Sequence, residues 1–343
     1  MRIGMIAPPW LPVPPPAYGG TEAVLDGLVR GLIQAGHEVV LVGHPDSQTP
    51  AEIRSVLPRG STDAIGQGAT ELAHVVAAYE QLSDVDVIHD HTLSGPLLGP
   101  RRTDVPIVTT HHGVFDDPTI RIFRDAARST QVLAISHCQA AAAADIPIAA
   151  VVHHGIDVED FELGDGDGGY LAFLGRMVPE KGPHDAIRIA RRLGVPLLLA
   201  AKMREAPEIA FFEAEVRHLL GGDIEYIGEV GHHDKLQLLC GARALLNPIA
   251  WPEPFGMVML EALGCGTPVV ARAEGAAPEI VDHGTVGFLG HTDAELEAGV
   301  RDLDRIDRLT CRTWAAQHFS LELMAKRYEE QYLLAVEERA EAA

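Results

Sequence analysis

The feature that most constrains the fold is an alternation of short apolar runs with helix-sized stretches, which occurs twice along the chain. Runs of Val, Ile, Leu and Ala separated by helices are typical of parallel strands that are buried on both faces. The sequence therefore predicts an α/β protein with two doubly wound sheets. The predicted strands are 3–7, 39–42, 85–89, 107–110, 132–135 and 150–152 in the first half, and 170–174, 197–200, 224–227, 244–246 and 268–271 in the second.

A Gly- and Asp-rich segment at 162–169 separates the two halves. Glycine loses much backbone entropy when it is ordered and aspartate favours turns, so this segment predicts a linker. A chain of 343 residues is also long enough for two domains. We expect a first domain over 1–162 and a second over 163–319. The last segment, 320–343, has the apolar spacing of a helix.

The composition excludes several classes of function. The net charge of −22 disfavours general binding to nucleic acids or anionic lipids, because an acidic surface repels phosphate. Arg121, Arg124 and Arg128 form the one basic cluster with helical spacing, and we interpret them as a solvated helix face. The apolar run at the N-terminus is too short for a membrane span or a signal peptide, so we expect a cytoplasmic protein. The oligomeric state stays open.

Gly19 and Gly20 follow the first predicted strand and precede the first predicted helix. Backbone N–H groups at such a position can approach a phosphate. A structural tight turn explains the two glycines equally well, because the G-x-G-x-x-G fingerprint of dinucleotide-binding proteins does not follow either first strand.

A stronger signal is Gly-Arg-Met-Val-Pro-Glu-Lys-Gly at 175–182, directly after the first strand of the second domain. Open parallel sheets bind their ligands at this end of the strands. The planar fork of Arg176 and the compact charge of Lys181 suit a diphosphate whose negative charge grows as it leaves. The alternative is that Lys181 only solvates the helix that follows.

The most informative segment is 251–268, Trp-Pro-Glu-Pro-Phe-Gly-Met-Val-Met-Leu-Glu-Ala-Leu-Gly-Cys-Gly-Thr-Pro. It predicts a Pro-rich loop that contains Glu253, followed by a helix over 255–263. Glu261 falls within that apolar helix, where a carboxylate needs a specific hydrogen-bonding partner such as ribose hydroxyls. Glu253 precedes the free N–H groups of the helix, although it could be a simple helix-start carboxylate.

Glu253 and Glu261, with seven residues between them, resemble the E-x7-E signature of the retaining glycosyltransferase family GT4. The segment 175–182 is similar to the diphosphate motif of that family, and Tyr-Gly-Gly-Thr-Glu at 18–22 is similar to its N-terminal Gly loop. Further matches lie at 86–91, 153–157 and 275–281. The resemblance covers nearly the whole chain in order.

The resemblance implies a GT-B fold, in which two Rossmann-like domains face each other across a cleft and the C-terminal helix packs back on the first domain. It implies that Arg176 and Lys181 hold the diphosphate, that Glu261 binds the ribose and that Glu253 contacts the sugar hydroxyls. No cofactor and no divalent metal are implied. The remaining residues implied to contact the nucleotide sugar are Gly19, Gly20, Gly228, Phe255, Gly256, Met257 and Val258.

The histidine that contacts the donor sugar in this family aligns with His112, and His111 is the alternative. Both follow a predicted strand on the side of the presumed cleft. His154 stands where many relatives have Asn, which leaves the role of that position open.

Two other patterns could suggest a metal. Asp84 to Asp86 and Asp165 to Asp167 both fit the D-x-D motif of a different glycosyltransferase architecture, but the first enters a strand and the second lies in the linker. His89 and His91 share a strand face and have no apparent third ligand. We expect no metal at either place.

The sequence thus predicts transfer of a hexose from a nucleotide sugar, UDP- or GDP-linked, to a small-molecule or glycan hydroxyl with retention of configuration. The rival interpretations are another GT-B enzyme such as a sugar-nucleotide epimerase, and a catalytically silent sugar-nucleotide-binding subunit. The silent subunit would be expected to lack Arg176, Lys181 or Glu253, and all three are present.

Overall fold

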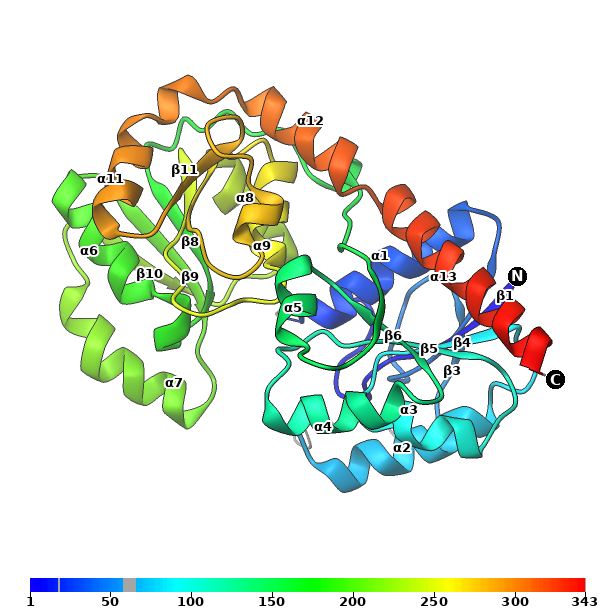
Figure 1. Ribbon diagram of the computed structural model, residues 1–343. Coiled ribbons are helices and arrows are strands. Elements are labelled where there is room, and N and C mark those ends of the chain that lie inside the picture. Colours follow the sequence, from blue (N-terminus) through cyan, green and yellow to red (C-terminus); the bar gives the residue numbers. More distant parts are fainter. Residues whose placement is uncertain (18, 58–65, 343) are drawn as a thin grey trace. The chain divides into compact units, whose positions relative to one another are not determined.

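The computed structural model describes residues 1–17, 19–57 and 66–342 (Figure 1). The chain forms two compact units. The first combines Met1–Gly155 with Leu321–Ala343, and the second is Ile156–Ser320. The sequence predicts these divisions at 162/163 and 319/320. Tyr18, the first residue of the predicted N-terminal Gly loop, lies outside the described residues.

The first unit is built on a parallel sheet of seven strands in the order β3-β2-β1-β4-β5-β6-β7. The chain starts in the middle of this sheet, moves to one side through β3, and then crosses back past β1 to continue on the other side. The order therefore reverses between β1 and β4. The strands are β1 (Arg2–Ile6), β2 (Glu38–Val42), β3 (Glu52–Arg54), β4 (Val87–Asp90), β5 (Ile107–Thr110), β6 (Gln131–Ala134) and β7 (Ile148–Val151).

Helices cover the first sheet because its strands are apolar on both faces. Val75, Ala78 and Tyr79 of α2 pack with Val40 and Ile88 of the sheet to form one layer of the core. The helices of this unit are α1 (Gly20–Gln34), α2 (Gly68–Glu80), α3 (Gly95–Leu98), α4 (Asp117–Ala126), α5 (His137–Ala142) and α13 (Leu321–Ala342), with a short 3-10 turn at Gly99–Arg101.

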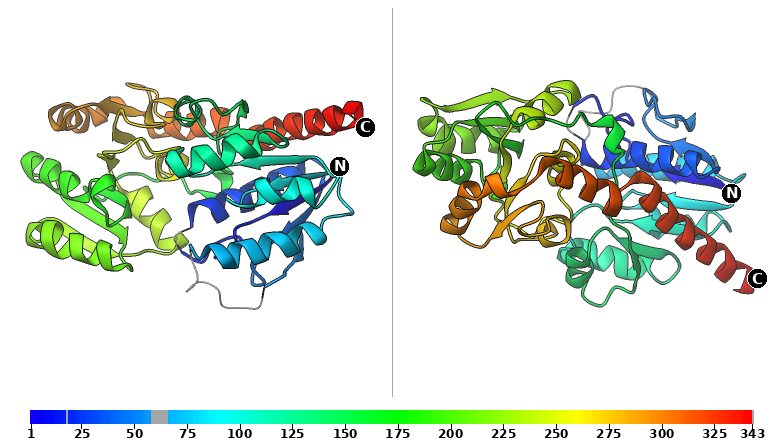
Figure 2. Two further views of the ribbon diagram at one scale, coloured as in Figure 1. Left: turned by 60° about the horizontal axis from the view of Figure 1, so that its bottom comes forward. Right: turned by 90° about the horizontal axis from the view of Figure 1, so that it is seen from above.

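The last helix, α13, packs closely against α1 (Figure 2). A Cβ at Gly27 would lie 2.9 Å from the Leu321 side chain, and a Cβ at Gly31 would lie 2.9 Å from the Leu321 carbonyl oxygen and 3.1 Å from Ala325. These contacts require glycine on α1 and fix α13 in the first unit. Farther along α13, Tyr328 and Tyr332 are fully buried.

The second unit contains a parallel sheet of six strands in the order β10-β9-β8-β11-β12-β13. Its order reverses between β8 and β11. The strands are β8 (Leu171–Arg176), β9 (Leu197–Lys202), β10 (Ile224–Gly228), β11 (Ala244–Asn247), β12 (Val269–Arg272) and β13 (Gly287–Gly290).

The core of the second unit forms where α6 covers this sheet, with Ile187 and Ile189 packed with Phe173 and Leu199. The helices of the unit are α6 (Pro183–Leu193), α7 (Ala206–Phe211), α8 (His232–Gly241), α9 (Met257–Gly264), α10 (Ala277–Ile280), α11 (Asp293–Arg301) and α12 (Arg308–His318). Shorter turns lie at Val158–Asp160, Pro179–Lys181, Phe212–Val216, Arg217–Leu219 and Leu303–Arg305.

Every strand predicted from the sequence is present, and two strands were missed. β3 is a partly exposed edge strand with a charged residue at each end, so it carries no apolar signal. β13 contains only four residues and has glycine at both ends. Gly287 is required there because a Cβ would collide with the backbone of Val269 on the neighbouring strand.

The helix predicted over 255–263 was wrong at its start. It begins at Met257 because Gly256, with a φ of 104°, has a left-handed conformation that ends the preceding loop. Phe255 is therefore a buried loop residue. Within the described part of the chain, no helix is both long and apolar enough to span a bilayer.

The close packing of α1 and α13 predicts that Gly31→Val lowers the stability of the first unit by about 1–3 kcal/mol, because the larger side chain would force the helices apart. The shift of the urea denaturation midpoint measures this loss. Gly68→Val is the matched control, since a Cβ at Gly68 meets nothing within 4 Å. Equal shifts for the two variants would contradict the contact.

Candidate active site

The carboxyl ends of β8 and β11 flank the point where the strand order of the second sheet reverses. Ligands of open α/β sheets bind at such switch points. The loop after β8 carries Lys181, and the loop after β11 carries Glu253. Two residues that are distant in the sequence are thereby brought to one place.

Lys181 and Glu253 form a direct ion pair. The side chains are 13% and 14% exposed, so water screens the pair poorly. The Lys181 ammonium also lies 5.7 Å from the centre of the Trp251 ring, a distance at which a cation interacts with the aromatic face. The Glu253 Oε2 atom is buried and has no hydrogen-bonding partner among the described residues.

The two loops are held together by their backbones. The Ala250 N–H donates to the Glu180 carbonyl at 2.8 Å. Gly182 has a left-handed φ of 72° and packs against the Pro248 carbonyl, where a Cβ would not fit. The ion pair therefore rests on a fixed framework.

Arg176 ends β8 and is held by carboxylates. Its Nε donates to Glu208 at 2.9 Å, and its Nη2 lies 3.3 Å from Glu205. Burial alone would raise the pKa of Glu208, but hydrogen bonds from the Arg204 and Glu205 amides and from Arg176 outweigh it and hold that pKa below its usual range. Glu208 is thus a fixed anion that orients the guanidinium.

Glu261 lies on α9 and accepts a hydrogen bond from Lys235 of α8 at 2.5 Å. The sequence predicts a specific partner for this buried carboxylate, and the structure identifies Lys235 as one. Glu261 is 8% exposed, so Lys235 stabilises a charge that would otherwise be costly to bury.

The N-terminus of α9 contributes free backbone amides. Met257 and Val258 are its first residues, and a helix start leaves such N–H groups without intrahelical partners. Gly228 ends β10 with a φ of 86°, and a Cβ there would meet no atom within 4 Å. The backbone at this position is therefore accessible.

In the first unit, the strand order reverses between β1 and β4, and the loop after β1 ends at Gly19, because Gly20 is already the first residue of α1. A Cβ at Gly19 would lie 2.7 Å from Pro15, so close packing requires glycine there. A Cβ at Gly20 would meet nothing within 4 Å, which leaves the start of α1 open to an approaching group. Burial raises the pKa of the adjacent Glu22 to about 7.

A cluster of histidines fills the carboxyl edge of the first sheet. The rings of His89 and His91 are 3.8 Å apart, and His91 Nδ1 lies 2.9 Å from His112 Nε2. His112 in turn stacks on His154, with ring centroids 5.3 Å apart. His89 is also bonded to Tyr332 of α13 at 2.7 Å.

Burial keeps this histidine cluster uncharged. It lowers the pKa of His112 to about 3, with a further contribution from His111, and it lowers the pKa values of His89, His91 and His154 well below the usual range. His91 Nε2 and His112 Nδ1 have no hydrogen-bonding partner within the described chain. Neutral imidazoles of this kind can exchange hydrogen bonds with a polar ligand without carrying charge.

His111 and His112 differ in their surroundings. His111 is bonded to the Val114 carbonyl at 3.0 Å and packs its ring on Phe115 and Phe123. These contacts give His111 a structural role in its loop. His112 retains an unpartnered nitrogen, which favours His112 as the ligand-facing residue.

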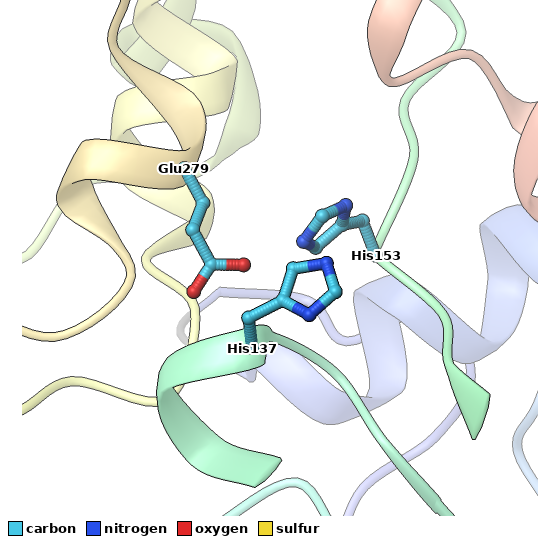
Figure 3. Close-up of side chains that lie close together, drawn as sticks. All are labelled: His137, His153 and Glu279. Carbon is cyan, nitrogen blue, oxygen red and sulfur yellow. The ribbon is translucent and has the colours of Figure 1, made fainter. Parts of the chain in front are cut away.

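Two further histidines follow the next strands of the same sheet. Figure 3 shows His137 at the start of α5 and His153 after β7. The centroids of these two rings are 5.7 Å apart. Glu279, also drawn there, lies on α10 of the second unit. Imidazoles therefore follow each of the four strands from β4 to β7.

The two D-x-D patterns are engaged in structural contacts. Asp84 is paired with Arg54 at 2.8 Å and with Arg2 at 3.1 Å. Asp165 caps its own turn by accepting a hydrogen bond from the Asp167 amide at 3.0 Å.

In the basic cluster of Arg121, Arg124 and Arg128, Arg124 pairs with Asp145, and Arg128 pairs with Asp125 at 3.2 Å.

Comparison with protein families decides the identity of the chain. The profile of Glycosyltransferase Family 4 matches residues 18–160, and the profile of Glycosyl transferases group 1 matches residues 157–308. The chain belongs to glycosyltransferase family GT4. It is accordingly an enzyme of the glycosyltransferase class.

The relatives of this glycosyltransferase agree with that assignment. D-inositol 3-phosphate glycosyltransferases of Mycobacterium tuberculosis and Mycobacterium bovis are 32% identical over 158 residues, or 41% of this chain. The matched segment spans 33% of the length of those relatives. AviGT4, a glycosyltransferase involved in avilamycin A biosynthesis, is 27% identical over 98% of both chains with a TM-score of 0.72.

Two more distant structures share the fold. HepE of Anabaena, solved with UDP and glucose, is 21% identical with a TM-score of 0.75, and the match covers 96% of this chain and 99% of HepE. Sucrose-phosphate synthase from Thermosynechococcus elongatus is 18% identical with a TM-score of 0.80, covering 97% of this chain and 98% of the synthase. The two parallel sheets of this glycosyltransferase thus have the GT-B architecture.

Glu208 and Lys235 of this glycosyltransferase are not predictable from the sequence. Both are single charged residues on helices, and no local motif marks them. A signal was present for Lys235, because the buried Glu261 needed a partner, but the sequence did not indicate which cation would supply it.

The buried histidines predict that acid destabilises this glycosyltransferase. A histidine whose pKa is depressed in the folded state gains its proton first in the unfolded chain, so stability falls as the pH drops below about 6.5. Glu22 and Asp90, with pKa values raised to about 7 and about 6 by burial, act in the opposite direction. Burial also lowers the pKa values of His74, His111 and His232. Because the histidines with lowered pKa values outnumber these two carboxyls, we expect the Tm to fall between pH 7 and pH 5.

His91→Gln tests this expectation, since it removes one titrating group and should flatten the fall of the Tm with acid. His218→Gln, at an exposed position of the second unit, is the control. An unchanged pH dependence in His91→Gln would show that the cluster does not cause the loss.

Proposed function

We propose that this GT4 enzyme transfers a hexose from a nucleotide diphosphate sugar to an acceptor hydroxyl with retention of configuration and without a metal ion. The observation that carries the proposal is the pair of Lys181 and Glu253 at the switch point of the second sheet. A cation for the phosphates and a carboxylate for the sugar hydroxyls stand side by side there, as donor binding requires.

The proposed roles follow from the positions of the groups. Arg176 and Lys181 would neutralise the diphosphate as it leaves, and Glu261 would accept hydrogen bonds from the ribose. Glu253 would accept from the hydroxyls of the sugar. Gly228, Phe255 and the amides of Gly256, Met257 and Val258 would complete the nucleotide-sugar site of the second unit. For His112, Gly19 and Gly20 of the first unit, we propose the donor contacts that the family resemblance implies.

The proposed reaction needs no protein nucleophile. The acceptor oxygen bonds to the anomeric carbon on the face from which the diphosphate leaves, and the bond from that carbon to the phosphate oxygen breaks. The acceptor proton passes to a diphosphate oxygen. Glu253 lies beside the cation that we propose to bind the diphosphate, and we assign it a role in binding the sugar hydroxyls.

Metal independence is proposed because side chains supply the positive charge. Arg176 and Lys181 can take the place that a divalent ion has in enzymes with a D-x-D motif. The carboxylate of Asp84 is already paired with Arg54 and Arg2, and Asp165 stabilises a turn. Neither motif presents a free carboxylate pair to a diphosphate.

The donor and the acceptor are proposed by class. HepE was solved with UDP and glucose, so UDP-glucose is the first donor to test, with GDP-hexoses as the alternative. The D-inositol 3-phosphate glycosyltransferases and AviGT4 favour a small-molecule or glycan acceptor. Such substrates are consistent with a cytoplasmic enzyme.

Arg176→Ala and Lys181→Met should each reduce turnover of the donor by about 10²-fold or more, because each removes a charge that stabilises the leaving diphosphate. Release of UDP or GDP from the hexose conjugates, measured with EDTA present, reports turnover. Arg188→Ala, at an exposed arginine on α6, is the control and should keep wild-type turnover.

Near-normal turnover in either site variant would contradict the assignment of the site. Tight donor binding without any transfer or hydrolysis would favour the silent subunit. Conversion of the donor sugar to an epimer, without release of UDP or GDP, would instead favour an epimerase.

A further inference from the structure

We infer that Glu253 makes the site discriminate between the intact donor and the nucleotide diphosphate that remains after transfer. The inference rests on the proposed function and adds a second role for Glu253 beyond contacting the sugar. It follows because Glu253 and the diphosphate compete for the same cation, Lys181.

Lys181 is the cation that both anions need. Its ammonium already bonds Glu253, and its side chain passes over Gly175, with Cγ 3.8 Å from the position of a Cβ there. The stem thus runs along the carboxyl end of β8, where the proposed diphosphate binds. A diphosphate at that edge would draw the ammonium away from Glu253.

Glu253 has less reach than its partner, because its side chain is shorter than that of lysine and its backbone is fixed on both sides. The Glu253 N–H donates to the Trp251 carbonyl at 2.8 Å, and the Ala276 N–H donates to the Glu253 carbonyl at 3.0 Å. Gly275, with a left-handed φ of 58°, packs directly on the Glu253 backbone. The flexible lysine is therefore the side chain that changes partner.

The second carboxylate oxygen shows what can replace the lysine. Glu253 Oε2 is buried without a partner in the described chain, and it lies 3.7 Å from the position of a Cβ on Gly256, beside the start of α9. An acceptor at this place can take hydrogen bonds from sugar hydroxyls. The intact donor supplies such hydroxyls, and the bare nucleotide diphosphate does not.

UDP and UDP-glucose consequently differ in whether the Glu253 carboxylate keeps a hydrogen-bonding partner once Lys181 binds the phosphates. When UDP takes Lys181, a poorly solvated carboxylate remains without a partner and beside two phosphates, which is unfavourable. When UDP-glucose takes Lys181, the sugar hydroxyls satisfy the same carboxylate. Glu253 thus weakens the binding of the product relative to the donor and favours its release.

Calorimetric titration of UDP and UDP-glucose into the wild-type enzyme and Glu253→Gln tests the inference, with GDP and GDP-mannose used if those bind instead. Removing the charge should strengthen UDP binding by about tenfold or more, which corresponds to the loss of an unpaired-charge penalty of roughly 1.4 kcal/mol. UDP-glucose binding should weaken or stay constant, so the ratio of the two affinities changes in favour of UDP.

Glu180→Gln is the matched control. It removes the same charge from the residue next to Lys181, but Glu180 is exposed and its side chain is directed to solvent rather than paired with that lysine. We expect its ratio of affinities to equal that of the wild type. If Glu253→Gln does not fold by circular dichroism, Glu253→Ala serves in the same comparison.

The outcomes separate the two proposals. An unchanged affinity ratio in the Glu253 variant, or the same change in Glu180→Gln, would overturn the inference and leave the proposed function intact. If the wild-type enzyme binds none of the four ligands, the proposed function itself fails.

Discussion

The position of the site depends on one constraint. Parallel strands that are buried on both faces can expose their loops only where the strands end. In both units the strand order reverses in the middle of the sheet, between β1 and β4 and between β8 and β11. Two loops diverge at each reversal and leave room for polar groups at the carboxyl edge. The residues that carry charge or imidazole gather there, while the centre of each sheet stays apolar.

Three cations of the candidate site in the second unit are each balanced by a carboxylate. Arg176 is held by Glu208, Lys181 by Glu253 and Lys235 by Glu261. Such pairing lets charged groups occupy a partly buried site without the full desolvation cost of an isolated charge. It also holds each group in one orientation before any ligand arrives, which is the form of preorganisation that catalysis of group transfer uses.

Much of this fold is predictable from the sequence because most strands consist of short runs of apolar residues. β1 and β8 are found in this way, whereas β3 and β13 are short edge strands that lack the signal. The candidate residues are also predictable one by one, from the spacing of Glu253 and Glu261 and from the basic residues after β8. The partners of these residues are not predictable. Glu208 reaches Arg176, and Lys235 reaches Glu261, only through the packing of the folded chain.

The assignment of α13 to the first unit has a consequence for how the protein is made. Residues 1–155 lack their last helix until the ribosome has also produced the whole of 156–320, because α13 begins at Leu321. Until then Gly27 and Gly31 of α1 have no helix to pack against, and His89 lacks the hydroxyl of Tyr332. The second unit is continuous in sequence and can complete its core during synthesis, so the part of the chain made first is the part that finishes folding last.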